Sequence, residues 1–259
     1  MPDRIRLDGK VAVVTGAAGV IGRATIQLLA ERGARIVAID RKREELEAAT
    51  RDLPASAQAL AVTADVSDED EVADYVRTAV DAFGTIDVFY NNAGVEGDVA
   101  PITKYSLESF RKVIDVNVVG VFLGMKHVLP VMLKQDKGSI INTASIAGLM
   151  GSPHIAVYSA SKHAVIGLTK SAAWECTATG VRVNCVCPGL IDSRMLSTIL
   201  QGRNQGNAPT PNEKIVERIP ARRLGQASEV ASIVAFLASD EASYVSGSAY
   251  TVDGGRTAA

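Results

Sequence analysis

Cysteine and histidine are scarce in this chain of 259 residues, which has three of each. The odd number of cysteines argues against a disulfide framework. If residues 181–187 form a strand, Cys185 and Cys187 point to the same face, and we expect them to be buried thiols. The histidines lie at no metal-ligand spacing with the cysteines, so we expect no metal site.

The chain also lacks an excess of one charge, since 27 basic and 29 acidic residues leave a net charge of −2. No block of Lys or Arg stands out, so nucleic acid and anionic membranes are poor candidate partners. Residues 1–10 mix charges and lack the apolar core of a signal peptide. The longest apolar region, Val113–Leu133, contains Asp115 and Lys126 and is better interpreted as a buried helix than as a membrane span. We expect a soluble, cytoplasmic protein.

Apolar, β-branched segments alternate with helical patterns along the whole chain, with no linker or internal repeat between them. Strands that are apolar throughout, separated by helices, indicate a parallel sheet covered on both faces. Right-handed crossovers then give a doubly wound, seven-stranded parallel Rossmann sheet of the α/β class, in one domain over residues 1–259. The expected strands are Val11–Thr15, Arg35–Ile39, Ala59–Thr63, Ile86–Tyr90, Ser139–Thr143, Val181–Cys187 and Ala249–Val252.

The expected helices are Val20–Glu31, Arg43–Leu53, Ser67 to about Phe83, Leu107–Leu133 and Val157–Thr177. The third of them opens with a sequence similar to a capping box. Gln201–Asn212, by contrast, is polar and rich in Gly, Asn and Pro, and such a long segment is either functional or disordered. We interpret about 193–220 as a lid that closes over a substrate.

A glycine-rich turn, Gly16 to Gly22, lies between the first strand and the first helix. In this position glycines let the backbone approach a pyrophosphate at the positive end of the helix, which favours a dinucleotide site over an ordinary tight turn. Asp40 ends the second strand, where a carboxylate binds the adenosine ribose hydroxyls and repels a 2′-phosphate. The sequence therefore predicts NAD. Arg41 and Lys42 leave NADP open, because a basic residue there could receive that phosphate.

Tyr158 and Lys162 are four residues apart, on one face of the predicted helix. A free tyrosine has a pKa of about 10. A nearby ammonium group favours the phenolate and brings that pKa toward the working range of an acid/base group. Ser145 follows the fifth strand, at the edge where α/β sheets present ligand-binding groups, and its hydroxyl can donate to a substrate oxygen.

Together these residues resemble the short-chain dehydrogenase/reductase family, and the resemblance covers nearly the whole chain. Two positions depart from the family pattern: Val20 stands where glycine is usual, and Ser193 where threonine is common. The matching segments are Thr15-Gly16 to Gly22, Asp65-Val66, Asn91-Asn92-Ala93-Gly94, Asp115 to Gly120, Ser145, Tyr158 with Lys162, Pro188-Gly189 and Val252 to Gly255.

The resemblance implies that Tyr158 is the acid/base and that Lys162 lowers its pKa and binds the nicotinamide ribose. It also implies that Ser145 orients the substrate oxygen, that Asn117 holds a water-mediated proton relay, and that Asn91 contacts the cofactor. A homotetramer with the helices 107–133 and 157–177 in one interface is implied as well. The expected cofactor residues are Gly16, Gly19, Val20, Ile21, Gly22, Asp40, Arg41, Asp65, Val66, Asn92, Ala93, Gly94, Tyr158, Lys162, Pro188, Gly189, Ile191 and Ser193.

The segment Asn92–Gly97 and the closing segment are most similar to bacterial family members that act on cyclic ketones. A mostly apolar pocket is expected, and it suits a hydrophobic or cyclic secondary alcohol better than a sugar or a charged acyl-carrier thioester. For two of the candidate substrate residues, Glu96 and His154, a structural role is the favoured alternative. The candidates are Glu96, Ile146, Met150, His154, Leu190 and Met195.

The sequence thus predicts an oxidoreductase that transfers a hydride between NAD(H) and a secondary alcohol or ketone. A 3-oxoacyl carrier-protein reductase shares every motif, but such enzymes usually prefer NADPH, and Asp40 argues against that. An epimerase or dehydratase usually has a larger C-terminal region. A non-catalytic NAD-binding sensor would be expected to lose Ser145, Tyr158 or Lys162, and the chain has all three.

Overall fold

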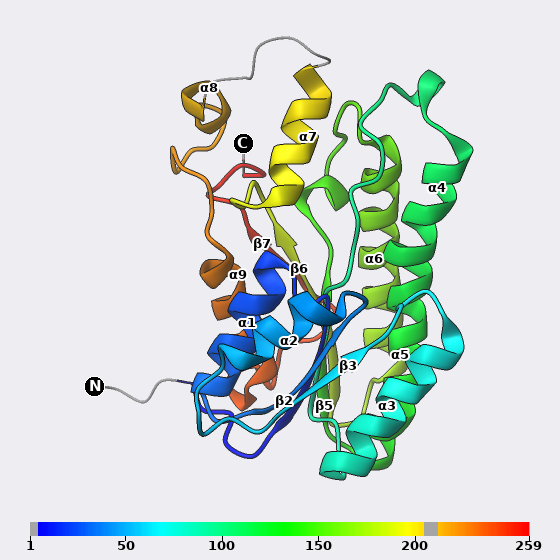
Figure 1. Cartoon of the computed structure of the whole chain (residues 1–259), viewed down its shortest axis with the longest axis vertical. Coiled ribbons are helices and arrows are strands. Elements are labelled where there is room, and N and C mark those ends of the chain that lie inside the picture. Colours follow the sequence, from blue (N-terminus) through cyan, green and yellow to red (C-terminus); the bar gives the residue numbers. More distant parts are fainter. Residues whose placement is uncertain (1–4, 205–211, 259) are drawn as a thin grey trace.

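Parallel strands and helices alternate in the computed structural model, which describes residues 5–204 and 212–258 (Figure 1). The strands of the described residues are β1 (Val11–Thr15), β2 (Arg35–Asp40), β3 (Ala59–Thr63), β4 (Val88–Asn91), β5 (Gly138–Thr143), β6 (Val181–Pro188) and β7 (Ala249–Val252). They form one parallel sheet in the order β3-β2-β1-β4-β5-β6-β7. This order confirms the predicted doubly wound, seven-stranded sheet, and it places the switch point between β1 and β4.

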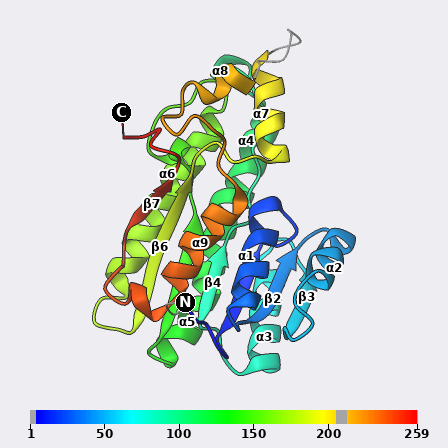
Figure 2. The same ribbon diagram turned by 90° about the vertical axis from the view of Figure 1, so that its left-hand side faces the viewer.

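Two layers of helices cover the sheet: α1, α2 and α9 lie on one face, and α3, α5 and α6 on the other (Figures 1 and 2). The α-helices of the described residues are α1 (Val20–Glu31), α2 (Arg43–Arg51), α3 (Glu69–Phe83), α4 (Leu107–Ile114), α5 (Gly120–Lys134), α6 (Ala156–Glu175), α7 (Arg194–Asn204), α8 (Asn212–Val216) and α9 (Ala227–Ala238). Short 3-10 turns lie at Ile102–Lys104, Ile146–Gly148 and Asp240–Ala242.

Each strand of the sheet contributes to two hydrophobic cores because successive side chains point to opposite faces. In β1, Val11 and Val13 pack with α3, α5 and α6, whereas Ala12 and Val14 pack with α1 and α9. Both faces are therefore dry, which explains why the strands are apolar throughout. Cys185 and Cys187 of β6 lie in the first of these cores and are free and buried, as predicted. Cys176 is also free and buried.

The helix predicted over Leu107–Leu133 is interrupted. Residues Asp115–Val119 form a π-helical turn between α4 and α5, and the extra residue shifts the faces of the two halves. By length and composition Leu107–Lys134 could cross a membrane. In the fold, however, its buried residues pack against β4 and β5, and this accounts for its apolar character.

Helices α3 and α9 also differ from the prediction. Helix α3 begins at Glu69 rather than Ser67, because the Asp68 carboxylate accepts hydrogen bonds from the N–H groups of Asp70 and Glu71. Helix α9 was not predicted at all. It is apolar on nearly every side, so it shows no amphipathic pattern, and the capping box of Gln226 and Glu229 sets its start.

The predicted lid region contains two helices, α7 and α8, which lie beyond the carboxyl ends of the strands (Figure 1). The prediction of a polar loop over Gln201–Asn212 was wrong for its first residues, because α7 extends through Asn204. Residues 205–211 of that loop lie outside the described residues.

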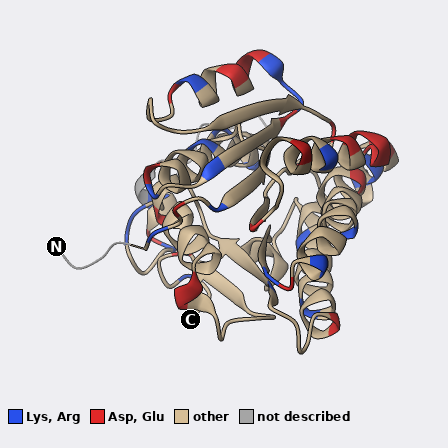
Figure 3. Cartoon of the chain, turned by 90° about the horizontal axis from the view of Figure 1, so that it is seen from below, with Lys and Arg blue, Asp and Glu red and all other residues tan. Residues whose placement is uncertain are grey.

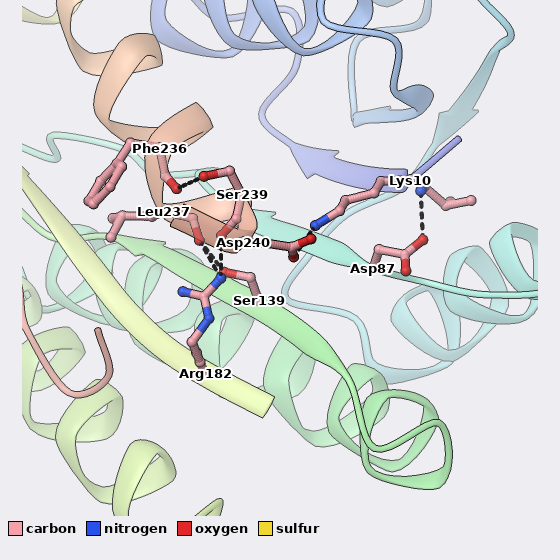
Figure 4. Close-up of polar contacts among 9 residues, drawn as sticks. Lys10, Asp87, Ser139, Arg182, Phe236, Leu237, Ser239 and Asp240 are labelled. Atoms are coloured by element: carbon pink, nitrogen blue, oxygen red, sulfur yellow. Dashed lines mark hydrogen bonds and ion pairs between the residues drawn. The ribbon is translucent and has the colours of Figure 1, made fainter. Parts of the chain in front are cut away.

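At the opposite, amino-terminal edge of the sheet, polar groups bond to one another (Figure 4). The Arg182 guanidinium on β6 donates to the carbonyl oxygens of Leu237 (2.8 Å) and Ser239 (3.0 Å) at the end of α9. The hydroxyl of Ser139 on β5 donates to the same Leu237 carbonyl at 2.8 Å. These bonds use up carbonyl groups that the helix end leaves without partners, and they fasten α9 to the sheet.

The start of β1 is fastened at the same edge (Figure 4). The Asp87 carboxylate accepts from the backbone N–H of Val11 at 2.9 Å, and the Lys10 ammonium pairs with Asp240 at 2.7 Å. Val11 is fully buried, so its N–H has little access to water and depends on this carboxylate.

Positions of Lys, Arg, Asp and Glu are interspersed along the outer helices and loops when the molecule is seen from below (Figure 3). Several pair locally, for example Arg43 with Glu47 at 2.7 Å and Arg77 with Asp74 at 2.7 Å. Opposite charges placed side by side cancel at a distance, in keeping with the net charge of −2.

Candidate functional site

The carboxyl ends of the strands open into a cavity of about 820 Å³. Its walls come from the loops after β1 to β6, from α6 to α8 and from the C-terminal tail. With the exception of Asn91, the residues that the sequence assigns to the cofactor line this cavity. The cavity lies at the topological switch point, where ligands bind in open α/β sheets.

The backbone of the loop after β1 is open to close approach by a ligand. Gly16 has a φ of +64°, and a Cβ atom there would lie 2.9 Å from the Cα atom of Ala93, so only glycine fits. Gly19 is the N-cap of α1, and no described side chain caps this helix start. The N–H groups of the first turn are therefore available to an anion, as a pyrophosphate requires. Val20, the departure from the family pattern, is half exposed and lines the cavity without closing the loop.

Asp40 lies at the cavity wall at the end of β2. Its carboxylate accepts from the N–H groups of Ala18 (3.1 Å) and Lys42 (3.2 Å), and these two bonds hold it at the strand end. The Lys42 ammonium pairs with Glu45 at 2.6 Å. Arg41 and Lys42 are the two basic residues that could receive the 2′-phosphate of NADP. Of these, Lys42 already forms an ion pair with a carboxylate.

Thr15, which belongs to the matching glycine-rich segment but was not assigned to the cofactor, ties β1 to the loop after β4. Its buried hydroxyl accepts from the N–H groups of Asn92 (2.9 Å) and Ala93 (3.1 Å). Asn91, expected to contact the cofactor, does not line the cavity. Its side chain points away and donates to the Val121 carbonyl at 2.9 Å, because neighbouring strand residues face opposite sides.

The structure brings Ser145, Tyr158 and Lys162 together on the cavity wall. Ser145 follows β5, and its hydroxyl accepts from the Ala147 N–H at 3.1 Å. Tyr158 and Lys162 share one face of α6, with the Lys162 ammonium 5.6 Å from the centre of the Tyr158 ring. That ammonium donates to the Thr143 carbonyl at 2.7 Å, which fixes it below the tyrosine.

Burial dominates the ionisation of both groups. It raises the pKa of Tyr158 to about 12, an effect that the Ser145 hydroxyl offsets in part and the negative charge of Glu96 increases. Burial also lowers the pKa of Lys162 to about 8. Burial is thus the largest cause of the shift in the tyrosine pKa, and the lowering by Lys162 that the resemblance implies stays a prediction. At neutral pH the phenol holds its proton and can donate it.

Asn117 lies in the π-helical turn and is fully buried, behind the cavity wall rather than on it. Its side-chain oxygen accepts from the Val95 N–H at 2.8 Å, and its amide nitrogen donates to the Val95 carbonyl (2.9 Å) and to Ser161 (3.0 Å). A Cβ atom added to Gly94 would lie 3.2 Å from the Asn117 oxygen and 3.5 Å from the Lys162 nitrogen. Because Gly94 has no Cβ atom, the space between the Asn117 side chain and the Lys162 ammonium stays open.

Four of the six candidate substrate residues line the cavity: Ile146, Met150, Leu190 and Met195. The other two do not. Glu96 is buried and accepts from Arg194 at 3.0 Å, so it anchors the start of α7.

His154 has a left-handed backbone (φ +67°), and its carbonyl accepts from the Ala100 N–H at 2.8 Å. This bond ties the loop after β4 to the segment before α6. For both His154 and Glu96 the geometry corresponds to the structural role that was the favoured alternative.

The sequence missed part of the lining. Apolar side chains from α6 to α8 extend the pocket, and basic side chains lie at its far end. The missed residues include Ile155, Ile199, Ile215, Arg203, Lys214, Arg218 and Arg256. An apolar spacing of four residues, Met195 to Ile199, was the available indication of a helix, but the polar composition of the following residues concealed it.

Comparison with known proteins decides the family. A family model described as enoyl-(acyl carrier protein) reductase matches residues 16–257. The chain is also 39% identical to levodione reductase of Leifsonia aquatica over 98% of its length and 96% of that protein. The chain belongs to the short-chain dehydrogenase/reductase family. It is 40% identical to cyclohexanol dehydrogenase of Acinetobacter sp. (97% and 96% of the two chains). It is 39% identical to a 3-oxoacyl-[acyl-carrier-protein] reductase of Thermotoga maritima (97% and 99%).

Solved structures agree with this family. A crystal structure of levodione reductase superimposes with a TM-score of 0.95, covering 98% of this chain and 100% of that one, at 39% identity. NAD⁺-bound xylitol dehydrogenase gives a TM-score of 0.91 at 36% identity over 96% and 99% of the two chains. A polyketide ketoreductase with NADPH gives 0.92 at 36% identity over 95% and 97%. The chain is an oxidoreductase of this family that acts on CH–OH groups, and the predicted family and reaction class are confirmed.

Proposed function

We propose that this enzyme interconverts a hydrophobic, cyclic secondary alcohol and its ketone, with NAD(H) as the cofactor. The observation that carries the proposal is the placement of Ser145, Tyr158 and Lys162 in one cavity with an apolar lining. Relatives that are named for cyclic substrates, levodione reductase and cyclohexanol dehydrogenase, support the cyclic part of the proposal.

The chain's own residues then have distinct roles. NAD⁺, when bound, supplies the hydride acceptor. Tyr158 moves the proton: its hydroxyl gives a proton to the carbonyl oxygen in reduction, and its phenolate, formed when the hydroxyl proton leaves through the water relay, takes the alcohol proton in oxidation. The Ser145 hydroxyl donates to the substrate oxygen and holds it beside Tyr158. The Lys162 ammonium binds the nicotinamide ribose and favours the phenolate when it forms. Asn117 completes the proton path through water.

The preference for NAD over NADP rests on Asp40. Its carboxylate stands at the ribose end of the cavity and would repel a 2′-phosphate. The two bonds from Ala18 and Lys42 hold it there, and the pairing of Lys42 with Glu45 removes one cation that could offset it. Arg41 is the remaining basic residue of this corner that lines the cavity.

The alternative of a 3-oxoacyl carrier-protein reductase is favoured by relatives of that name at similar identity. Its usual preference for NADPH conflicts with Asp40, so the cofactor separates the two functions. The sensor alternative would be expected to lack one of Ser145, Tyr158 or Lys162, and these three side chains stand together in the cavity.

Three further expectations belong to the same proposal. The region 193–220 acts as a lid, because Met195 and Ile199 of α7 pack on the Tyr158 cluster. The enzyme is a cytoplasmic homotetramer in which α4, α5 and α6 form an interface. Large apolar side chains on these helices are exposed, among them Phe110, Phe122 and Trp174, and such surfaces are typical of subunit contacts.

The test is a set of initial rates with NAD⁺ and NADP⁺ against cyclohexanol, aryl-alkyl carbinols and a 3-hydroxyacyl thioester, with the Tyr158→Phe variant as the control. Turnover of the cyclic alcohols with NAD⁺, lost in the variant, is the expected result. A preference for NADP⁺ together with the thioester would instead establish the carrier-protein reductase.

A further inference from the structure

The cavity has two chemically different ends. The acidic residues that line it among the described residues are Asp40, Glu45 and Asp65, all at the ends of β2 and β3 or on α2. This is the end where the cofactor's adenosine is expected. Four basic residues line the other end, from α7, α8 and the two segments that follow α8 and β7: Arg203, Lys214, Arg218 and Arg256.

Helix α7 connects the reactive tyrosine to this basic end. Met195, Ile199 and Arg203 are spaced four residues apart and so lie on one face of α7. Met195 and Ile199 pack on the cluster that contains Tyr158. At 1.5 Å of rise per residue, Arg203 lies about 6 Å further along the axis than Ile199. The backbone of Arg203 is therefore about one helical turn beyond Ile199, and its side chain extends the cavity lining past the apolar residues of α7.

The Arg203 side chain is positioned by one hydrogen bond and has a further donor without a partner. Its guanidinium donates to the Ser152 hydroxyl at 2.7 Å, while its Nε atom is buried and has no hydrogen-bond partner. Burial, together with the positive charges of Arg256 and Arg218, lowers the pKa of Arg203. An arginine nevertheless stays charged in a protein.

Arg203, Arg218 and Arg256 lie close enough for their like charges to repel one another. No ion pair involves Arg203, Arg218 or Arg256 among the side chains that the structure describes. Arg256 instead donates to the backbone carbonyl of Arg218 at 2.6 Å. Like charges gathered in a partly buried site cost free energy, and an anion that enters the site removes that cost.

We infer that the substrate carries a carboxylate, or a similar oxyanion, on the side of its apolar body opposite the reacting carbinol, and that Arg203, Arg218 and Arg256 bind it. This inference rests on the proposed function and narrows it from hydrophobic cyclic alcohols to cyclic hydroxy acids and their keto counterparts. Arginine side chains suit this task because their planar donors match the two oxygens of a carboxylate.

Turnover gives the first test. The probes are 4-hydroxycyclohexanecarboxylate and its neutral amide, which has nearly the same shape. We expect the wild-type enzyme to prefer the acid in kcat/KM, and this preference to fall about 10- to 100-fold in Arg203→Gln, the loss expected for one charged hydrogen bond. Arg218→Gln, at an exposed position that places little demand on folding, should lower the preference in the same direction.

Arg222→Gln is the matched control. Arg222 lies in the same segment and is exposed, but it is not part of the cavity lining, and its side chain donates to the Glu217 carbonyl. The preference for the acid should be the same in this variant as in the wild type. An equal fall in Arg222→Gln would show a general effect of surface charge and would overturn the inference.

Binding of cyclohexanecarboxylate separates this inference from the proposed function, because this compound has no hydroxyl group to oxidise. Calorimetry with enzyme saturated by NAD⁺ should show that the wild type binds it more tightly than cyclohexanecarboxamide, and that Arg203→Gln loses most of the difference. Such binding supports the inference even if no tested alcohol is oxidised. Turnover of neutral alcohols without any preference for the carboxylate, in rate or in binding, would overturn the inference and leave the proposed function intact.

Discussion

At the edge of the sheet where the strands begin, polar side chains bond to the protein itself, whereas at the edge where they end, many of them face a cavity. Asp87, Ser139 and Arg182 at the first edge satisfy backbone groups of β1 and α9. Ser145 and Asp40 at the second edge also have internal bonds, but both line the space where a ligand can enter. The same strands thus fix the fold at one end and present chemistry at the other.

Burying polar groups at the second edge, where the strands end, lowers the stability of the fold. Lys162 is buried, and its lowered pKa shows that the folded protein holds the proton less readily than the unfolded chain. Its bond to the Thr143 carbonyl compensates only in part. By contrast, the first edge buries polar groups together with their partners. Variants at the two edges should therefore separate activity from stability.

Ser145→Ala should give the largest effect. Removing a hydroxyl that donates to the substrate oxygen is expected to lower kcat by about 100- to 1000-fold, because that donor acts most strongly on the charge that develops in the transition state. The thermal midpoint should change little. Steady-state kinetics and a thermal melt of the same preparation check both statements, and a loss of activity that follows a loss of fold would erase the contrast between the edges.

Asp40→Ser should change the choice of cofactor. Removing the carboxylate removes both the bonds to the ribose hydroxyls and the repulsion of a 2′-phosphate, so the ratio of kcat/KM for NADP⁺ to that for NAD⁺ should rise about 100-fold. This ratio is measured for the variant and for the wild type at the same salt concentration. A ratio that stays constant would show that Arg41 and Lys42, not Asp40, decide the preference.

Lys162→Met should impair activity yet stabilise the fold, by about 2 kcal/mol at neutral pH after allowance for the lost bond to Thr143. The pKa of Lys162 is lowered from 10.5 to about 8. Below pH 8 the folded protein carries the full cost of the buried charge. Between about pH 8 and 10.5 the folded lysine loses its proton while the unfolded one keeps it, so the wild type gains stability. Urea unfolding at pH 7 and 9.5 should therefore show the advantage of the variant shrinking, and an advantage that grows with pH contradicts the sign.

Asp87→Ala should give the smallest of these effects, a destabilisation of about 1 to 2 kcal/mol with kcat/KM unchanged, since it leaves the buried Val11 N–H without its acceptor. Asp87→Asn is the matched control, because the amide oxygen can still accept that bond. Urea unfolding of both variants beside their kinetics makes the comparison. Equal stability of Ala and Asn variants would remove the assigned role of Asp87.

The strands and the shared helix face of Tyr158 and Lys162 were predictable because their cause is local. A buried parallel strand needs a run of apolar residues such as Val11–Thr15, and the spacing of Tyr158 and Lys162 puts both on one helix face. The π turn was not predictable in this way. It depends on bonds between Asn117 and Val95, which are 22 residues apart in the sequence.

Other features of the cavity could not be predicted from the sequence, for similar reasons. Asn91 belongs to the right motif, but the pleat of β4 turns its side chain toward α5. The basic end of the cavity joins Arg203 to Arg256, which are distant in sequence and become neighbours only when α7 and the C-terminal tail meet. The sequence predicted an apolar pocket but could not indicate which basic side chains lie at its far end.

Direct hydride transfer from the carbinol carbon is the central claim, and isotope transfer tests it most directly. The measurement is the deuterium content of NADH formed from NAD⁺ and cyclohexanol deuterated at the carbinol carbon, compared with the ketone formed. One deuterium in each NADH per ketone is the predicted result. Deuterium released to water, or ketone formed without labelled NADH, would contradict the account and show that the site abstracts a proton instead of transferring a hydride.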